Sequence, residues 1–327
     1  MNYEVRNCID AGTEYCPCHL AAANECIICS QLSGKSFCDC INWKGTCILQ
    51  EYKSNGNTPK AQRKSYNSQI EEKQLLEKNI LKLKIKVPRK LAQDLACPGS
   101  YIFIRKTNTM QFYDTPISIM HVDLDNNIIS VAIEIRGIKT KTILDLNKGD
   151  KILVRGPFWN GIFGLKNIYQ CRNSKAVIAA RGIGLAPMVP VIEKLIANNN
   201  EIVLIIDKTP FSEIMSEEYI KEFNLDIQYM KIIEKGDLTE VFKSYVNSLI
   251  KERSFSLLHC SGADILSYKA TKEFQDKIKL SCCNNAKMCC GEGVCGSCSS
   301  RYKGHVVKRL CKIQCEPNNL FEGRRLI

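Results

Sequence analysis

The segment MCCGEGVCGSC, residues 288–298, contains four cysteines and three glycines. Cys290, Cys295 and Cys298 follow one another with C-x4-C-x2-C spacing, which is the spacing of the thiolate ligands around a plant-type [2Fe–2S] cluster. The glycines between them tolerate positive φ and leave backbone N–H groups open to the cluster's sulfides. Zinc sites favour a C-x2-C pair on each side instead. The pattern therefore predicts a [2Fe–2S] cluster, which transfers single electrons.

A two-iron cluster needs a fourth thiolate, and the chain continues with cysteines at two suitable positions. We expect Cys311 to be this ligand, with Cys315 as the alternative. Three other cysteines, Cys282, Cys283 and Cys289, lie beside the segment. The sequence does not decide whether they are packing residues, spare thiols or ligands in another register.

Eight further cysteines lie between residues 8 and 47, mostly in C-x-C and C-x2-C pairs that bring two thiolates within reach of one ion. A segment with so few large aliphatic residues is expected to fold only around a bound ion. The ion is either a structural zinc or a second iron centre, mononuclear or iron–sulfur, that relays electrons. The expected ligands are Cys16, Cys18, Cys26, Cys29, Cys38 and Cys40.

The composition narrows the class of protein that holds these thiols. No apolar run approaches the about 18 residues that a membrane helix needs, and the first residues have no apolar leader, so we expect a cytoplasmic protein. In a reducing compartment, clustered cysteines favour metal binding over disulfides. The net charge of +12 suits an acidic protein partner. No basic motif interleaved with aromatic residues indicates nucleic acid binding, and no nucleophile–base constellation indicates hydrolysis.

The elements that must position these residues change character along the chain. Period-two segments such as ILKLKIKVP predict half-buried strands of a small antiparallel barrel, and the later alternation of apolar strands with helices predicts a parallel, doubly wound sheet. The predicted order is a cysteine-rich module, a linker with a short helix in QIEEKQLLEKN, the barrel, the α/β domain and the cluster segment, at residues 1–50, 51–74, 75–170, 171–279 and 280–327.

From about residue 75 onward, this order resembles the ferredoxin-reductase-like flavoproteins, in particular the electron-transfer subunits of dihydroorotate dehydrogenase and sulfide dehydrogenase (the ferredoxin:NADP oxidoreductase small subunit). Five motifs carry the resemblance in the family's order along the chain. They are TPISI, GDKILVRGPFWNGIF, ARGIGLAPM, HCSGADIL and MCCGEGVCGSC.

The resemblance implies an electron-transfer flavoprotein subunit. FAD would lie across the barrel, and NAD(P) would dock on the α/β domain and exchange a hydride with the flavin. Single electrons would then pass through the [2Fe–2S] cluster to or from a redox partner, either a partner subunit or an acidic carrier such as a ferredoxin. In such a subunit the bound cofactors perform the redox chemistry and the protein sets distance and access.

The resemblance also implies which residues bind the two nucleotides. Most of them supply backbone contacts or glycine turns for the flavin and the dinucleotide phosphates, while an acid at the end of the second α/β strand favours an unphosphorylated ribose. They are Pro116, Ile117, Ser118, Gly137, Thr140, Gly156, Pro157, Asn160, Gly161, Gly182, Gly184, Pro187, Asp207, Cys260 and Gly262.

Four positions depart from the family's pattern: Thr115 replaces an arginine, Lys139 and Arg181 replace glycines, and Ser261 changes the CGP motif to CSG. Lys139 either supplies the charge lost at Thr115 or crowds the pyrophosphate. Together the departures support an alternative function, a non-catalytic iron–sulfur sensing or binding protein on the same fold with degenerate nucleotide sites.

Overall fold

The computed structural model describes the chain except for residues 1–6, 40–44, 78, 253, 303–305 and 322–327. It divides into two compact units, each built from two stretches of chain. Unit 1 comprises Met1–Lys64 and Ala286–Cys315, and unit 2 comprises Ser65–Asn285 and Glu316–Ile327. The predicted cysteine-rich module and the cluster loop (residues 288–298) thus fall in the same unit. The two predicted nucleotide domains fall together in the other.

Unit 2 begins with an antiparallel sheet whose strand order is β4-β3-β7-β1-β2-β6-β5. This confirms the predicted antiparallel domain, but in the described residues no ladder joins the edge strands β4 and β5 to close a barrel. Its elements are β1 (Ser65–Leu76), β2 (Ile80–Lys86), α3 (Arg89–Leu95), β3 (Tyr101–Lys106), β4 (Thr115–Ser118), β5 (His121–Asp123), β6 (Ile128–Glu134), α4 (Ile138–Leu144) and β7 (Lys151–Phe158).

The short helix predicted within residues 51–74 is wrong, because the segment from Ser65 onward is strand β1. Glu, Lys, Gln and Leu favour a helix locally. Here the backbone pairs with β7 on one side and β2 on the other, and Ile70 is fully buried in the core. Pairing on both sides outweighs the local preference. A helix, α2 (Ile48–Ser54), lies earlier, at the boundary between the predicted module and linker.

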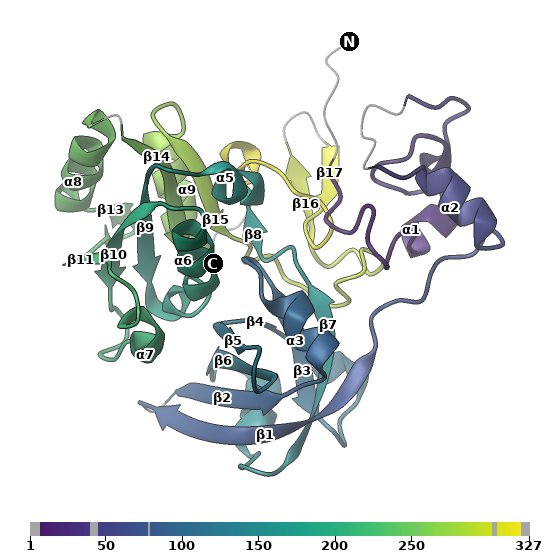
Figure 1. The fold of residues 1–327 in the computed structure, drawn as a ribbon, viewed down its shortest axis with the longest axis horizontal. Coiled ribbons are helices and arrows are strands. Elements are labelled where there is room, and N and C mark those ends of the chain that lie inside the picture. The colour runs from purple at the N-terminus through teal and green to yellow at the C-terminus, as the bar shows by residue number, and fades with distance from the viewer. Residues whose placement is uncertain (1–6, 40–44, 78, 253, 303–305, 322–327) are drawn as a thin grey trace. The chain divides into compact units, whose positions relative to one another are not determined.

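The second sheet of unit 2 has the order β11-β10-β9-β14-β15-β8, in which the first five strands run parallel and β8 pairs antiparallel with β15 (Figure 1). This confirms the predicted doubly wound domain. Its strands are β8 (Ile162–Phe163), β9 (Lys175–Arg181), β10 (Glu201–Asp207), β11 (Asp226–Tyr229), β14 (Phe255–Ser261) and β15 (Lys279–Cys283), and a small hairpin is formed by β12 (Ile233–Glu234) and β13 (Asp237–Leu238). Its helices are α5 (Leu165–Gln170), α6 (Val189–Ala197), α7 (Glu217–Ile220), α8 (Glu240–Lys251) and α9 (Asp264–Phe274).

Unit 1 has little regular structure in the residues that the structure describes. It contains α1 (His19–Ala22), α2 and the hairpin of β16 (Ser299–Tyr302) and β17 (Val306–Arg309). A β-bridge pairs Cys8 with Ile313, so the first part of the chain lies against the end of the cluster segment. Among the described helices of both units, none is long and apolar enough to cross a membrane.

Candidate functional site

Unit 2 contains a cavity of about 390 Å³ where its two sheets meet. Strand β4 lines one part of it with Pro116, Ile117 and Ser118, and the turn after β9 lines another with Gly182 and Gly184. The predicted flavin strand and the predicted nucleotide turn therefore face the same space. Three further predicted residues, Gly161, Pro187 and Gly262, also line it.

The glycine turn after β9 is fixed to the end of β14. Gly182 has a φ of 60°, a conformation that favours glycine. At Gly184 a Cβ atom would lie 2.2 Å from the carbonyl oxygen of Ser261, so no side chain fits there. The Ser261 hydroxyl donates a 2.7 Å hydrogen bond to the Gly184 carbonyl. The serine that departs from the family's CGP motif therefore holds the nucleotide turn in place.

Asp207, predicted to contact a ribose, is buried and does not line the cavity. Its carboxylate accepts hydrogen bonds from Arg181 Nε at 3.1 Å, from the Thr209 hydroxyl at 2.6 Å and backbone N–H at 3.1 Å, and from the Ile232 N–H at 2.9 Å. The carboxylate thus binds donors of the protein itself. Arg181, which replaces a family glycine, lines the cavity while its Nε is held by this acid.

The segment around Gly161 supports the cavity by close backbone packing. The Gly161 N–H donates to the Gly99 carbonyl at 2.8 Å, and a Cβ on Gly161 would approach that oxygen to 2.6 Å. Asn160 is fully buried beside it. Gly156 and Pro157 lie within β7, and a Cβ on Gly156 would lie 3.1 Å from Ile102. Asn160, Gly156 and Pro157 are therefore core residues that shape the sheet without lining the cavity.

Gly137 and Thr140 form the start of α4. The Thr140 hydroxyl oxygen accepts hydrogen bonds from the N–H groups of Arg136 at 3.0 Å and Gly137 at 3.2 Å, which caps the helix. Neither Gly137 nor Thr140 lines the cavity, but Arg136 does. The predicted pyrophosphate turn therefore presents an arginine, rather than its own glycine, to the cavity.

A group of basic residues surrounds the start of β4, where Thr115 stands in place of the family's arginine. Asp114 is buried between Arg105, at 2.5 Å, and Arg155, at 3.0 Å. The Lys139 ammonium donates to the Asp114 carbonyl at 3.1 Å. Lys139 thus lies against the segment that lacks the family's charge.

Cys260 is buried and lies outside the cavity lining, and burial raises the pKa of its thiol to about 12. It is therefore a neutral packing residue. Cys283, whose role the sequence left open, lines the cavity and lies 3.4 Å from the Ser261 hydroxyl. Cys283 is the last residue of β15. Ligands bind at the carboxyl ends of the strands in such sheets, so this position could have identified Cys283 as a site residue from the sequence.

In unit 1 the cluster loop has the backbone that its glycines predict. Gly291, Gly293 and Gly296 have φ values of 73°, 79° and 71°. The Glu292 N–H donates to Cys290 Sγ at 3.3 Å. Such N–H···S contacts are the ones that a loop wrapped around a cluster requires.

Cys298 and Cys311 are the two buried cysteines of the predicted ligand set. Their thiols hydrogen-bond to each other, and the Cys311 N–H donates to Cys298 Sγ at 3.4 Å. The Cys311 thiol, more than the backbone donors, lowers the pKa of Cys298 to about 6, and the same contact raises the pKa of Cys311. The structure therefore brings these two predicted ligands into direct contact.

The remaining predicted ligands are not gathered around this pair. Cys295 is exposed, and Cys290 and Cys315 are half-buried. Among the described residues, no three His, Cys, Asp or Glu side chains are placed to hold a metal ion. The complete set of Cys290, Cys295, Cys298 and Cys311 stays a prediction, and the structure places Cys311 rather than Cys315 against Cys298.

The predicted N-terminal ligands separate into two groups. Cys16, Cys18 and Cys26 line a second, small cavity. Cys29 lies beside it and donates its N–H to Cys26 Sγ at 3.4 Å.

The other two do not join them. Cys38 is exposed and does not line this cavity, and Cys40 lies outside the described residues.

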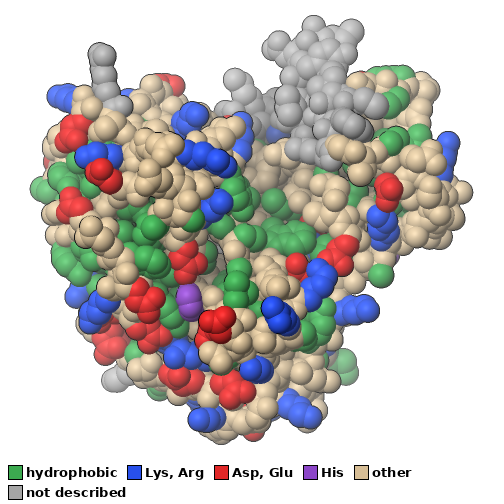
Figure 2. Space-filling model, in the orientation of Figure 1, with side chains coloured by type: hydrophobic (Ala, Val, Ile, Leu, Met, Phe, Trp, Pro, Cys, Tyr) green, Lys and Arg blue, Asp and Glu red, His purple; other side chains and the backbone are tan. Residues whose placement is uncertain are grey.

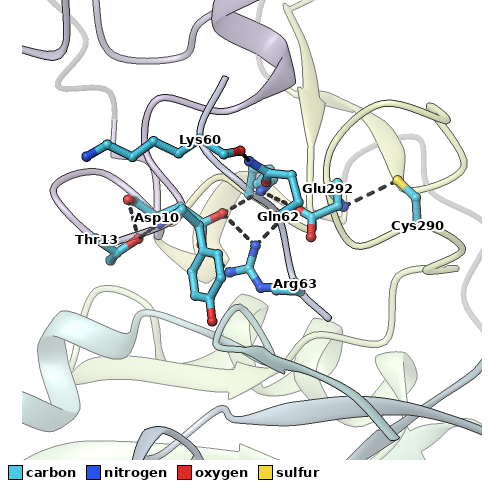
Figure 3. Close-up of polar contacts among 9 residues, drawn as sticks. Asp10, Thr13, Lys60, Gln62, Arg63, Cys290 and Glu292 are labelled. Carbon is cyan, nitrogen blue, oxygen red and sulfur yellow. Dashed lines mark hydrogen bonds and ion pairs between the residues drawn. The ribbon is translucent and has the colours of Figure 1, made fainter. Parts of the chain in front are cut away.

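A buried network of two acids and two bases connects four segments of unit 1. Arg63 Nη2 lies 2.7 Å from Asp10 and Nη1 lies 3.0 Å from Glu292, as Figure 3 shows. Lys312 pairs with the same two carboxylates, at 2.9 Å from Glu292. Burial alone would raise the pKa of Asp10, but the charges of Lys312 and Arg63 lower it overall. Buried charges are tolerated when they are paired in this way.

This network was missed by the sequence analysis because its four members are far apart in the chain and have no motif spacing. Glu292 belongs to the cluster loop, and Lys312 directly follows Cys311. A Cβ on Gly293 would lie 3.0 Å from Leu20 of α1. The network and this contact together hold the cluster loop against the N-terminal segment within unit 1.

Comparisons with known proteins place the chain in a family, although no family model matches it. It is 31% identical over 232 residues to the dihydroorotate dehydrogenase B (NAD(+)) electron transfer subunit of Clostridium acetobutylicum, covering 70% of this chain and 86% of the relative. It is 24% identical to the subunit of the same name from Streptococcus mutans, again over 70% of this chain and 86% of the relative.

Solved structures show the same fold. A chain of the NADH-dependent reduced ferredoxin-NADP oxidoreductase, described for flavin-based electron bifurcation, superposes with a TM-score of 0.61 at 20% identity, covering 77% of this chain and 87% of its own. The ferredoxin reductase of carbazole 1,9a-dioxygenase superposes with a TM-score of 0.51 at 11% identity, covering 68% and 70%. Given the first of the sequence relatives, the chain belongs to the family of the electron transfer subunits of dihydroorotate dehydrogenase B.

Proposed function

We propose that this chain transfers electrons between a nicotinamide nucleotide, an FAD and a [2Fe–2S] cluster, and exchanges them with a partner redox protein. One observation carries the proposal: strand β4 and the glycine turn after β9 line a single cavity. A flavin on β4 and a nicotinamide on the turn would therefore meet there, as hydride transfer requires.

The lining of the cavity suits a flavin ring. Its volume of about 390 Å³ is within the range of small-molecule sites. β4 is an edge strand, and one side of an edge strand presents backbone N–H and C=O groups that no neighbouring strand uses. Ile117 and Ser118 would orient the ring through these groups, and the Ser118 hydroxyl adds a polar contact. The backbone thus fixes the ring without a charged side chain.

The charges around the cavity suit a dinucleotide. Arg136 and Arg181 both line it, and arginine binds phosphate oxygens well. Because Gly184 has no side chain, the turn packs directly on β14 and keeps the cavity open. Arg181 would therefore add a phosphate-binding group to this site.

The sulfur and backbone N–H groups of the cluster loop in unit 1 are of the kinds that bind a [2Fe–2S] cluster. The buried Cys298–Cys311 pair, the N–H···S contacts at 3.3 and 3.4 Å and the positive-φ glycines are the parts that such a loop needs. When bound, the flavin converts a hydride into single electrons and the cluster carries them one at a time. The amides of Glu292 and Cys311 would keep two of the sulfurs oriented as thiolates, and the burial of Cys298 and Cys311 would exclude water.

The partner that we propose is a catalytic subunit or an acidic electron carrier. The net charge of +12 favours association with an acidic surface. On the face shown in Figure 2, basic and acidic side chains are intermixed. Recognition on that face would therefore depend on the pattern of charges as well as on the total.

The test is to purify the full chain without air and titrate it with NADH and, separately, NADPH. We expect about one FAD and about two cluster irons per chain, bleaching of the flavin absorbance, and the EPR signal of a reduced [2Fe–2S] cluster. A chain that carries iron and sulfide but no flavin would instead support the non-catalytic sensing function. A bound flavin that neither nucleotide reduces would contradict the nicotinamide step.

A further inference from the structure

We propose that the N-terminal segment of unit 1 binds a single divalent, thiophilic metal ion, such as Zn²⁺, through the sulfurs of Cys8, Cys16, Cys18 and Cys26. All four residues line one cavity of about 20 Å³. A space of this size holds about one water-sized sphere, which suits one ion and not a cluster of several irons. The proposal is independent of the nucleotide and [2Fe–2S] sites.

The choice of ligands follows from which cysteines face the cavity. Four thiolates around one ion form the usual tetrahedral structural zinc site. Cys8 enters the set although it lies outside the paired motifs of the sequence, because the bridge to Ile313 brings it to the cavity. Cys29 and Cys38 are left out because they do not line it. The rest of the lining is mainly apolar, including Leu20 and Ile48.

Backbone donors are already directed at three of the four sulfurs. The N–H of Cys29 donates to Cys26 Sγ at 3.4 Å, and the backbone of Ile28 also hydrogen-bonds to this sulfur. The backbone of Gly12 hydrogen-bonds to Cys16 in the same way.

The backbone of Asp10 likewise hydrogen-bonds to Cys8. Hydrogen bonds of this kind stabilise the negative charge of a thiolate and hold its orientation. They are of little use to a neutral packing thiol.

The segment has a structural need for such an ion. The apolar cluster around α1 and α2 contains only Ala21, Ile28, Leu32 and Ile48 as buried members among the described residues. None of the described cysteines forms a disulfide. Small folds with so little core are generally held by disulfides or a metal. Among the described residues no group of three such side chains is already placed to hold a metal ion, so binding would draw the four sulfurs inward by side-chain rotation.

The experiment measures zinc, iron and acid-labile sulfide in the full chain, purified without air. We expect about one zinc, or one iron not matched by sulfide, in addition to the [2Fe–2S] iron. The variant Cys16→Ser/Cys18→Ser should lose this ion, to below about one fifth of an equivalent. The control Cys47→Ser, an exposed cysteine at the start of α2 outside the cavity, should retain it.

Retention of the ion by the double variant would overturn the proposal, and so would additional iron matched by an equal amount of sulfide, which would indicate a second cluster. The double variant could lose the ion simply by unfolding, so a ligand-preserving variant provides a second measurement. With Co²⁺ in the site, Cys18→His should keep the ion and shift its ligand-field absorption bands to shorter wavelength, because nitrogen replaces sulfur. Unshifted bands would exclude Cys18 as a ligand. Flavin content and its reduction by nucleotide report on the other sites separately.

Discussion

The two units of this chain are stabilised in different ways. Unit 2 has a continuous apolar core through its antiparallel sheet, with fully buried residues such as Leu83, Ile129 and Val154. Unit 1 instead buries two acids and two bases with a small apolar cluster. Hydrophobic burial is non-directional and tolerates local change, whereas a buried ion network depends on every member. We therefore expect unit 2 to persist under changes that abolish unit 1.

The largest effect should follow from replacing the buried thiol of the cluster pair. Cys311→Ser is expected to remove the EPR signal of the [2Fe–2S] cluster almost completely, because Cys311 lies against Cys298, while unit 2 keeps its flavin. Cys315→Ser is the matched comparison and should keep the signal. The reverse result would assign the fourth ligand to Cys315.

The next effect concerns the ion network. Arg63→Ala should destabilise unit 1 by about 3–5 kcal/mol, since it leaves the Asp10 and Glu292 carboxylates buried with Lys312 as their remaining partner. Calorimetry should show the unit 1 transition at lower temperature and an unchanged unit 2 transition. Arg301→Ala removes the same charge from an exposed position of unit 1 and should leave both transitions in place. Equal shifts for the two variants would show that the network contributes nothing specific.

A smaller effect is expected in unit 2 from Gly184→Ala. The added methyl would lie 2.2 Å from the Ser261 carbonyl oxygen, and relieving such a contact costs about 1–3 kcal/mol. The free energy of unfolding should fall by this amount, and the rate of flavin reduction by nucleotide should fall with it. Gly137→Ala, where a Cβ meets nothing within 4 Å, serves as the stability control. An unaltered unfolding curve for Gly184→Ala would show that the turn is not fixed by β14.

A further prediction is a pH dependence of the stability of unit 2, which arises from the buried His259. His259 is fully buried, and burial lowers its pKa from 6.5 to about 3. Because the unfolded chain binds the proton more tightly, the stability of unit 2 should decrease as the pH falls from 6.5 towards 3, by at most about 1.4 kcal/mol per pH unit.

Replacing the ring tests this assignment. His259→Asn keeps a polar group near the Ser281 hydroxyl, which lies 2.9 Å from Nδ1, and should abolish this part of the pH dependence in urea unfolding curves. His121→Asn, at a half-buried position, should preserve it. If both variants keep the acid limb, another group causes it.

Unit 2 was easier to predict from the sequence than unit 1. Its main patterns are local in the sequence, whereas the contacts that build unit 1 join residues that are far apart in the chain. Period-two strands and the strand–turn–helix around Gly182 are local patterns, and both appear where expected. The segment that forms β1 was predicted incorrectly because its pairing with β2 and β7 is not visible in its own composition. Similarly, Asp207 was expected to contact a ribose because of its position in the fold. Its carboxylate instead accepts hydrogen bonds from Thr209 and Ile232.

In unit 1 the cysteine spacing predicted the loop conformation at Gly291, Gly293 and Gly296, which is a local property. Spacing could not predict that Arg63 would pair with Asp10 and Glu292, which lie 53 and 229 residues away. Nor could it predict that Cys8 lies with the C-x-C pair at the small cavity. Both depend on how distant segments meet.

The pairing of Cys8 with Ile313, together with the hydrogen bond from the Gln314 N–H to the Asn7 carbonyl at 2.7 Å, has a consequence for biosynthesis. The larger stretch of unit 2, Ser65–Asn285, is inserted in the chain between the two stretches of unit 1. Domains usually form in order as the ribosome releases them, but residues 7–64 must wait for residues 286–315 to emerge. A chain truncated before residue 286 would therefore contain most of unit 2 but lack a folded unit 1.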